Sequence, residues 1–368
     1  MERAGMVLQQ PGQAGAVGAA LAGGCGFRRF ALVTALLAAA WAGAAVLAVA
    51  NGPVRIPPVH VVSALADRVG IRAGTYEERE RLVIERLRLP RVVLATLTGA
   101  ALAAAGATLQ ALFRNPLADP GLLGVSSGAA TGAVAAIASG IGAASMWWVC
   151  GSAFAGAMGA VTLVYVLGAP GGRPVPSSLL LAGVAVSAFL GSVTSVVIAL
   201  VPPDEALRGI LFWLAGGFSG AQWGYVRVVG MPVIAGLLVM GLAGRQLNLL
   251  AVSEELAATS GVRVGLTRAV LLGAATLATA ASVSVSGTIG FVGLVVPHVL
   301  RLVLGPDYRY LLPASMVAGA AVLVGADTVA RTVVRPAELQ VGMVTALAGA
   351  PVFAVILLRQ RSRLAIQV

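Results

Sequence analysis

The sequence predicts an all-α membrane protein that crosses the bilayer about ten times. Of its 368 residues, 58% are hydrophobic and only 11% are charged, and the mean hydropathy is +0.94. Uncharged stretches of about 20 residues recur along the chain, and a helix of that length crosses the hydrocarbon core of a bilayer. This composition excludes a soluble globular protein, and we expect residues 28–363 to form one transmembrane domain.

The first 90 residues contain a tail, one span and a polar loop. Residues 1–27 are rich in glycine, alanine and glutamine without periodicity, which predicts a flexible tail. The apolar run at 30–50 is too long for the core of a signal peptide, so we interpret it as a first span. Residues 51–89 are the most polar part of the chain and predict a loop outside the membrane, with a short charged surface helix around 77–88.

The second span has the clearest limits. Between Arg91 and Arg114 lie 22 uncharged residues, which as a helix match the thickness of the hydrocarbon core. Small residues in its interior, including Gly99 and Gly106, predict close packing against other helices. Pro116 ends the helix, because proline disfavours helical geometry in the residue before it.

Three more spans follow. Residues 120–172 contain no charge and predict two helices with a glycine-rich break between them. A fifth span is predicted at 177–201, where Ser187, Gly191 and Ser195 fall on one helical face. That face indicates either ordinary packing of small residues or the wall of a polar passage.

The second half of the chain predicts five further spans and one short helix. Residues 204–214 form an amphipathic segment too short to cross, and a sixth span is expected at 225–243. Residues 269–300 predict a span and a shorter segment separated by glycines. The last two spans are expected at 311–330 and 339–358.

The loop at 245–265 predicts a helix of about seven residues outside the membrane. Ser253 is its N-cap, and Glu254 and Glu255 are the acids of its first turn. Leu256 offers an apolar contact, and Gly261 is the glycine at its C-terminal end. Isolated helices this short are marginal in water, so we expect this one to dock on a partner.

Ten spans place both termini on one side of the membrane. A ten-residue interval from glycine to proline occurs in both halves, at 106–116 and 287–297, and predicts the inverted repeat common in transporters.

Arginines are about equally numerous on the two predicted faces. Because the usual bias puts basic residues inside, the arginines of the outer face indicate an acidic partner there.

Several functional classes are excluded or disfavoured. All 25 basic residues are arginine, and a P-loop ATP site needs a lysine. The net charge of +11 is spread between apolar spans without an aromatic-interleaved patch, so no nucleic acid is expected. With two histidines, two cysteines and no HExxH motif, neither an enzyme site, a metal site nor a bound cofactor is expected. The spans alone leave a passive channel open as an alternative.

Six motifs occur in a recognisable order: RLPR (88–91), RNPLADPGLLGVSSGAA (114–130), LLLAGVAVSA (179–188), GTIGFVGLVVPHVLR (287–301), GADTVAR (325–331) and ELQVGMVTALAGAPVF (338–353). With them, residues 88–358 resemble the permease subunits of bacterial type II ABC importers for cobalamin, iron-siderophores and heme. Within this family the chain most resembles the heme permeases.

The resemblance implies a multi-pass subunit of the bacterial inner membrane with both termini in the cytoplasm. It implies import of an iron chelate, with heme favoured and a ferric siderophore or cobalamin as alternatives. The implied partners are a second copy of the chain, two cytoplasmic ATPase subunits that hold ATP and Mg²⁺, and a periplasmic binding protein. The permease itself then has no ATP site, 51–89 is a periplasmic loop, and 245–265 is the cytoplasmic coupling loop.

The resemblance also implies roles for residues. Arg88, Arg91 and Arg331 match positions that receive acidic residues of the binding protein, although Arg331 is also spaced to pair with Asp327 four residues earlier. The helix at 253–260 matches the element that couples to the ATPase.

The cytoplasmic constriction is implied at Asn115 and Leu117 together with Ser177 and Ser178, for which simple capping of helix ends is the alternative. The route above it runs along the 187/191/195 face. His298 is interpreted as a polar residue of a helix end rather than a heme ligand.

Overall fold

The structure, a computed structural model, describes residues 26–52, 55–68, 70, 74, 76–169, 175–203, 205–334 and 337–365. In this part of the chain every regular element is a helix, which confirms the all-α fold. The predicted flexible tail lies, up to residue 25, outside the described residues.

In chain order the helices are α2 (Phe27–Ala50), α3 (Pro58–Arg68), α4 (Glu78–Leu82), η1 (Val83–Arg88), α5 (Leu89–Leu112), η2 (Pro120–Leu123), α6 (Val125–Ala138), α7 (Ile141–Ala144), α8 (Met146–Gly168), α9 (Pro176–Leu200), α10 (Glu205–Ala215), α11 (Trp223–Leu242), α12 (Gly244–Val252), α13 (Glu254–Thr259), α14 (Val264–Ser286), α15 (Val292–Leu304), α16 (Tyr308–Thr332) and α17 (Val341–Ala365).

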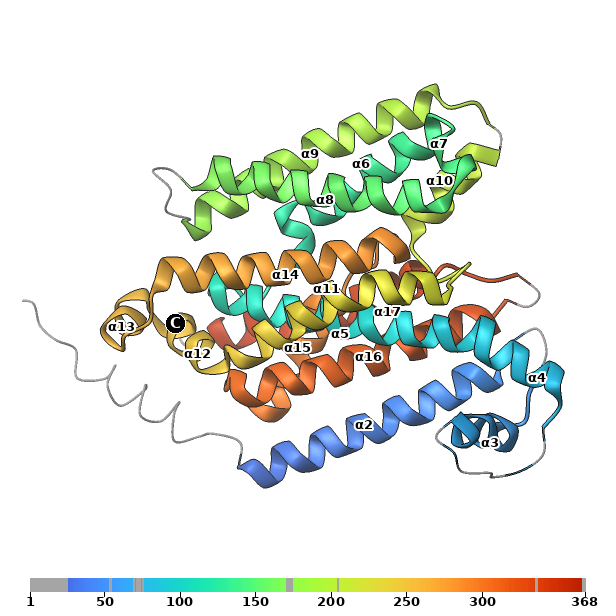
Figure 1. Ribbon diagram of the computed structural model, residues 1–368. Coiled ribbons are helices and arrows are strands. Elements are labelled where there is room, and N and C mark those ends of the chain that lie inside the picture. Colours follow the sequence, from blue (N-terminus) through green and yellow to red (C-terminus); the bar gives the residue numbers. More distant parts are fainter. Residues whose placement is uncertain are drawn as a thin grey trace, which may run out of the picture.

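Seven of the described helices are long and apolar enough to cross a membrane, namely α2, the continuous helix Glu78–Leu112, α8, α9, α11, α14 and α16. Three shorter apolar helices, Val125–Ala138, Val292–Leu304 and Val341–Ile356, lie where the other three spans were predicted. Apart from α17, these helices run side by side (Figure 1). One end of the bundle carries α12 and α13, and the opposite end carries α3 and α4. We call these the α13 end and the α3 end.

Helix α5 is the centre of the bundle. It packs against α11, α14, α15 and α16, and most of its side chains are buried. The predicted close approach occurs at its glycines: a Cβ on Gly99 would lie 2.2 Å from the carbonyl oxygen of Gly319, and Gly106 meets Gly293 in the same way. Backbones come this close only where side chains are absent, and such contacts drive helix association in lipid.

The predicted surface helix near 77–88 is continuous with α5 instead of separate from it. Helices α4, η1 and α5 form one helix from Glu78 to Leu112 of 35 residues. The turn before Pro90 widens into the π-helical segment η1, because a proline has no N–H for the preceding turn and its ring crowds that turn. Arg81 and Glu85, four residues apart on this helix, form an ion pair with a nitrogen–oxygen distance of 3.4 Å.

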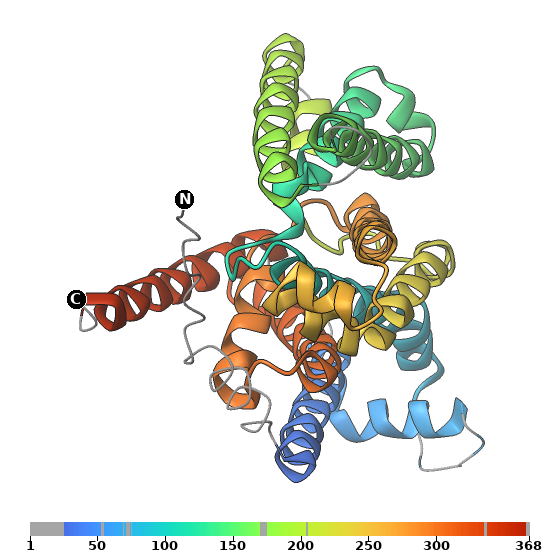
Figure 2. The same cartoon turned by 90° about the vertical axis from the view of Figure 1, so that its left-hand side faces the viewer.

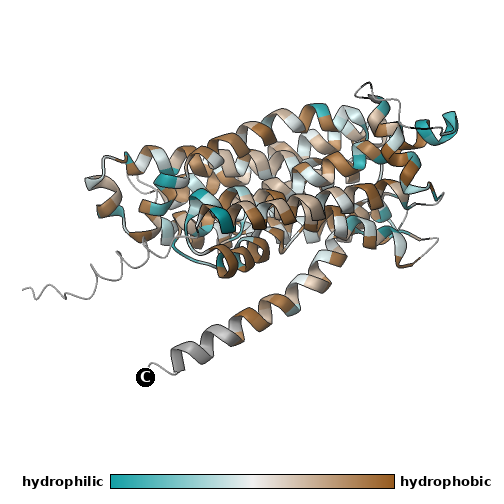
Figure 3. Cartoon of the chain, turned by 90° about the horizontal axis from the view of Figure 1, so that it is seen from below, coloured by the Kyte–Doolittle hydropathy of each residue, from teal (hydrophilic) through white to brown (hydrophobic). Residues whose placement is uncertain are grey.

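Two parts stand apart from this core. Helices α6, α8 and α9 form a group that packs on the rest mainly through α14 (Figure 2). Helix α17 leaves the bundle at the α3 end and extends away from it, as Figure 3 shows, and its segment Val341–Ile356 is apolar. Leu347 of α17 is 75% exposed and Leu181 of α9 is 72% exposed.

Candidate functional site

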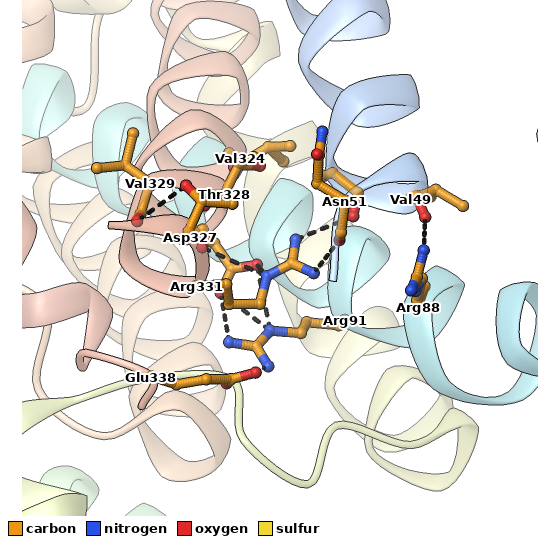
Figure 4. A network of polar contacts seen from close by, with 12 residues as sticks. Val49, Asn51, Arg88, Arg91, Val324, Asp327, Thr328, Val329, Arg331 and Glu338 are labelled. Carbon is orange, nitrogen blue, oxygen red and sulfur yellow. Dashed lines mark hydrogen bonds and ion pairs between the residues drawn. The ribbon is translucent and has the colours of Figure 1, made fainter. Parts of the chain in front are cut away.

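Charged side chains from α5, from α16 and from the connection to α17 meet at the α3 end (Figure 4). Arg91 Nε donates to Asp327 Oδ1 at 3.0 Å, and its Nη1 donates to Glu338 Oε2 at 2.9 Å. Arg331 Nε lies 3.1 Å from Asp327 Oδ2. The buried carboxylate of Asp327 therefore lies between two guanidinium groups. We call Arg88, Arg91, Asp327, Arg331 and Glu338 the arginine network.

Arg88 and Arg331 also bind the C-terminal end of α2. Their guanidinium nitrogens donate at 2.5–3.1 Å to the last carbonyls of that helix, those of Ala48, Val49, Ala50 and Asn51. The final carbonyls of a helix have no intrahelical donor and carry partial negative charge. Gly52 has no side chain, and this leaves room for the Arg88 guanidinium beside it. The two arginines thus fasten α2 to α5 and α16.

The structure brings together the three arginines predicted to dock a partner. The predicted alternative for Arg331, an ion pair with Asp327, is present. All three side chains are largely buried and held by groups of this chain, and docking stays a prediction. Sequence reasoning missed Glu338 and the α2 carbonyls as partners, because neither is near Arg91 or Arg88 in the sequence.

At the α13 end, α5 stops two residues before Arg114. Arg114 has φ +48°, in the left-handed region that residues other than glycine rarely adopt. Asn115 Oδ1 then accepts a hydrogen bond from the N–H of Leu117 at 2.9 Å, so this amide does cap the local turn. Pro116 breaks the helix as predicted.

The buried side chain of Gln110 holds the last turn of α5 in place. Its Nε2 donates to the carbonyls of Gly293 and Leu294 on α15, and its Oε1 accepts from Arg301 Nη2 at 2.9 Å. The N–H of Asn115 bonds to the carbonyl of Gln110 at 3.1 Å. Sequence reasoning did not single out Gln110, although an amide within an otherwise apolar span is a signal that such reasoning can use.

The remaining predicted gate residues lie on α9. Ser177 is exposed and Ser178 half-buried in its first turn, at the α13 end (Figure 1). Gly191 and Ser195 lie on the exposed side of α9. Ser187 is in a different setting, because its Oγ accepts a hydrogen bond from Ser127 of α6 at 3.2 Å.

The predicted coupling helix is α13. Ser253 caps it, with its side-chain oxygen accepting from the N–H of Leu256 at 3.0 Å. Gly261 follows it with φ +83°, a conformation that glycine adopts without strain. Glu255 is exposed, whereas Leu256 is partly buried. The preceding helix, α12, was not predicted.

Glu254 of α13 faces the bundle. Its Oε1 lies 2.7 Å from Arg268 Nη2 on α14 and 3.8 Å from Arg114 Nη2 at the end of α5. Arg268 is 6% exposed, whereas Glu254 and Arg114 are 39% and 45% exposed. We call Arg114, Glu254 and Arg268 the Glu254 network.

Helix α12 is anchored separately. Asn248 donates to Asp307 at 2.7 Å and accepts from the N–H of Tyr308 at 2.8 Å. Although burial acts to raise the pKa of Asp307, hydrogen bonds from Arg309 and Asn248 hold that pKa below its ordinary value. A charged N-cap therefore ties α12 to the start of α16.

His298 is buried within α15 rather than at a helix end, which corrects its predicted place. In the described part of the chain, no group of three or more histidine, cysteine, aspartate or glutamate side chains is placed to hold a metal ion.

Apolar spanning helices packed through small residues, with charged groups gathered at the two ends, define a polytopic membrane protein. Comparison with known families is more specific. The chain belongs to the FecCD transport family, whose profile matches residues 19–359. The resemblance to permease subunits of ABC importers is thereby confirmed.

Named relatives agree with this assignment. The chain is 46% identical over 284 residues to a cobalamin import system permease protein of Halobacterium salinarum, covering 77% of this chain and 75% of that protein. It is 41% identical over 280 residues to a hemin transport system permease protein of Yersinia pestis, covering 75% and 83%. A solved metal-chelate type ABC transporter in an inward-facing conformation matches with a TM-score of 0.79 at 29% identity, covering 89% of this chain and 99% of that one.

Proposed function

We propose that this chain is the membrane-spanning subunit of an ATP-driven importer that carries heme from the periplasm to the cytoplasm. The observation that carries the proposal is α13, a capped helix at one end of the bundle whose Glu255 faces outward. Such a helix suits a cleft on an ATPase partner, which would hold ATP and Mg²⁺. The chain itself contributes no lysine for a phosphate loop.

In this proposal the α13 end faces the cytoplasm of a bacterium and the α3 end faces the periplasm. Helix α2 begins at the α13 end (Figure 1), which agrees with a cytoplasmic N-terminus. The arginine network then lies on the side of the binding protein. Glu338 is 33% exposed beside the 12% exposed Arg91, so a carboxylate of the binding protein reaches Arg91 most directly by replacing Glu338.

A second copy of the chain covers the exposed apolar faces of α9 and α17. These faces include Leu181 and Leu347, both more than two-thirds exposed, and such continuous apolar surface indicates a partner or lipid. Pairing there brings the gate residues Asn115, Leu117, Ser177 and Ser178 of both copies toward one axis. Gly191 and Ser195 line the route above them, polar but without charge, which suits release of a bulky chelate.

Cobalamin is the second candidate substrate. The relative named for cobalamin import is 46% identical and the one named for hemin transport is 41% identical, so relatedness favours cobalamin slightly, whereas the sequence motifs favour heme. Both substrates are large macrocyclic metal chelates, and a wide uncharged passage accepts either.

Proteoliposomes that hold the chain with its ATPase partner test the proposal. They are supplied with the binding protein loaded with heme or with cyanocobalamin, and the absorbance of the internalised chelate is measured. We expect heme uptake that requires ATP and is absent with an ATPase partner unable to hydrolyse it. Uptake of cobalamin without uptake of heme would make cobalamin the substrate in place of heme. Passage of either chelate without ATP would indicate a passive channel.

A further inference from the structure

The end of α5 combines two features that the proposed function leaves unused. Arg114 has a left-handed backbone conformation that is unfavourable for a residue with a side chain. Its guanidinium group lies 3.8 Å from Glu254, a residue of α13, which is more than 100 positions away in the sequence. The strained residue directly precedes Asn115, the first of the gate residues.

The bundle holds this loop from two sides. On one side, Gln110 bonds to α15 and to Arg301, which fixes the last turn of α5. On the other side, Arg114 reaches Glu254. The first contact is buried, whereas the second is between two side chains that are each more than a third exposed. The second contact is therefore the one that movement outside the bundle can alter.

Helix α13 is placed to make such a movement. Helix α12 before it is tied to α16 through Asn248 and Asp307. Helix α14 after it provides Arg268, whose guanidinium group is 2.7 Å from Glu254. Glu254 thus forms ion pairs both with α14 and with the end of α5.

We propose that Glu254 is a positioning residue that transmits the displacement of α13 to the gate loop through Arg114. The inference rests on the proposed coupling role of α13 and goes beyond it by naming the link. When α13 moves, Glu254 stays with the buried Arg268 and changes its distance to Arg114. The loop at Arg114 and Asn115 is then either held by the contact with Glu254 or released from it.

The position of Arg114 suits this role. An exposed ion pair contributes little to stability, so it can form and break without unfolding the chain. A backbone held in an unfavourable conformation persists only while its surroundings hold it. Loss of the Glu254 contact therefore favours rearrangement of this loop over rearrangement of the buried turn at Gln110.

The test uses Arg114→Gln, Glu254→Gln and the double variant, each assembled with the ATPase partner and the binding protein loaded with heme, or with cyanocobalamin where the wild type carries that chelate. The number of chelates transported per ATP hydrolysed is the readout. We expect each single variant to lower this ratio about fivefold or more while the ATPase still co-purifies. The double variant should be no worse than the poorer single one, because both remove the same contact.

Two controls separate this link from other effects. Arg28→Gln removes another exposed arginine at the α13 end, at the start of α2 and outside the coupling loop, and should leave the ratio unchanged. Arg114→Lys keeps a cation near Glu254 and should recover part of the ratio. The inference would be overturned if both single variants kept the wild-type ratio of chelate transported to ATP hydrolysed. It would also be overturned if the fold-decrease of this ratio in the double variant equalled the product of the two single fold-decreases. Absence of ATP-driven uptake in the wild type would instead overturn the proposed function.

Discussion

The two ends of the bundle use the same residue types in opposite ways. In the arginine network Asp327 and Arg331 are 1% and 5% exposed, and every charge faces a carboxylate or the carbonyls of α2. In the Glu254 network two of the three side chains are more than a third exposed, and one of its two contacts is at 3.8 Å. Apart from Glu338 the first network is buried, whereas the second is largely open to solvent.

This difference determines what each network can do. A buried charge is tolerated only when it is fully paired, so removal of any partner leaves an uncompensated charge and the geometry is fixed. An exposed pair is screened by water and contributes little, so its geometry can change. The arginine network therefore fastens the α3 end, whereas the contact between Arg114 and Glu254 is adjustable, which fits the proposal that an ATPase partner acts at the α13 end.

Asp327→Asn tests the fastened end most severely. It removes the shared carboxylate between Arg91 and Arg331, and breaking a buried pair in this way costs about 3–5 kcal/mol of unfolding free energy. We expect a large loss of folded protein in membranes and a lower midpoint in unfolding by sodium dodecyl sulfate.

Arg114→Gln is the matched change at the α13 end. Its unfolding midpoint should stay near that of the wild type, because the pair that it removes joins side chains that are 45% and 39% exposed, and exposed pairs contribute about 0–1 kcal/mol. Equal destabilisation by the two variants would contradict the contrast between the networks.

Arg88→Leu should have an intermediate effect. It keeps apolar bulk but removes the donors to the carbonyls of Val49 and Ala50, and unsatisfied buried acceptors cost about 1–3 kcal/mol. The end of α2 should then exchange its amide hydrogens faster, which hydrogen–deuterium exchange with mass spectrometry measures. Arg86→Leu, at an exposed arginine two residues earlier, is the control and should change neither exchange nor stability. Unaltered exchange at the end of α2 in Arg88→Leu would show that other groups hold it.

The helices were predictable because each depends on local chemistry. A run of apolar residues long enough to cross the bilayer forms a helix whatever its neighbours are, and the segment from Arg114 to Pro116 marks the end of one. Even the short α13 followed from Ser253 and Gly261, which act within a few residues of themselves. Among the exceptions were α12, which was not predicted, and η1, where the turn before Pro90 widened and allowed one helix to continue instead of ending.

The side-chain partners were predictable only where they are close in sequence. The pair between Asp327 and Arg331 lies on one helical face, so its spacing revealed it. The contacts of Arg91 with Glu338 and of Glu254 with Arg114 join segments far apart in the chain. They depend on how whole helices pack, which periodicity does not specify. For the same reason Ser187, Gly191 and Ser195 were predicted to share one setting on α9, whereas Ser187 bonds to Ser127 of α6.

Glu338→Gln gives the smallest change in stability and the sharpest test of docking. Glu338 is partly exposed, and Arg91 keeps its two bonds to Asp327 when the Glu338 charge is removed. The unfolding free energy should therefore fall by no more than about 1 kcal/mol.

If the binding protein presents a carboxylate to Arg91, loss of the competing charge should strengthen its binding by a few-fold and raise the association rate at low salt. Surface plasmon resonance on the reconstituted complex measures both quantities, with Arg91→Gln as the variant expected to weaken binding. A weaker complex in Glu338→Gln would mean that Glu338 itself contacts the binding protein. An unchanged affinity in both variants would remove Arg91 from the docking surface and leave the arginine network with its structural role alone.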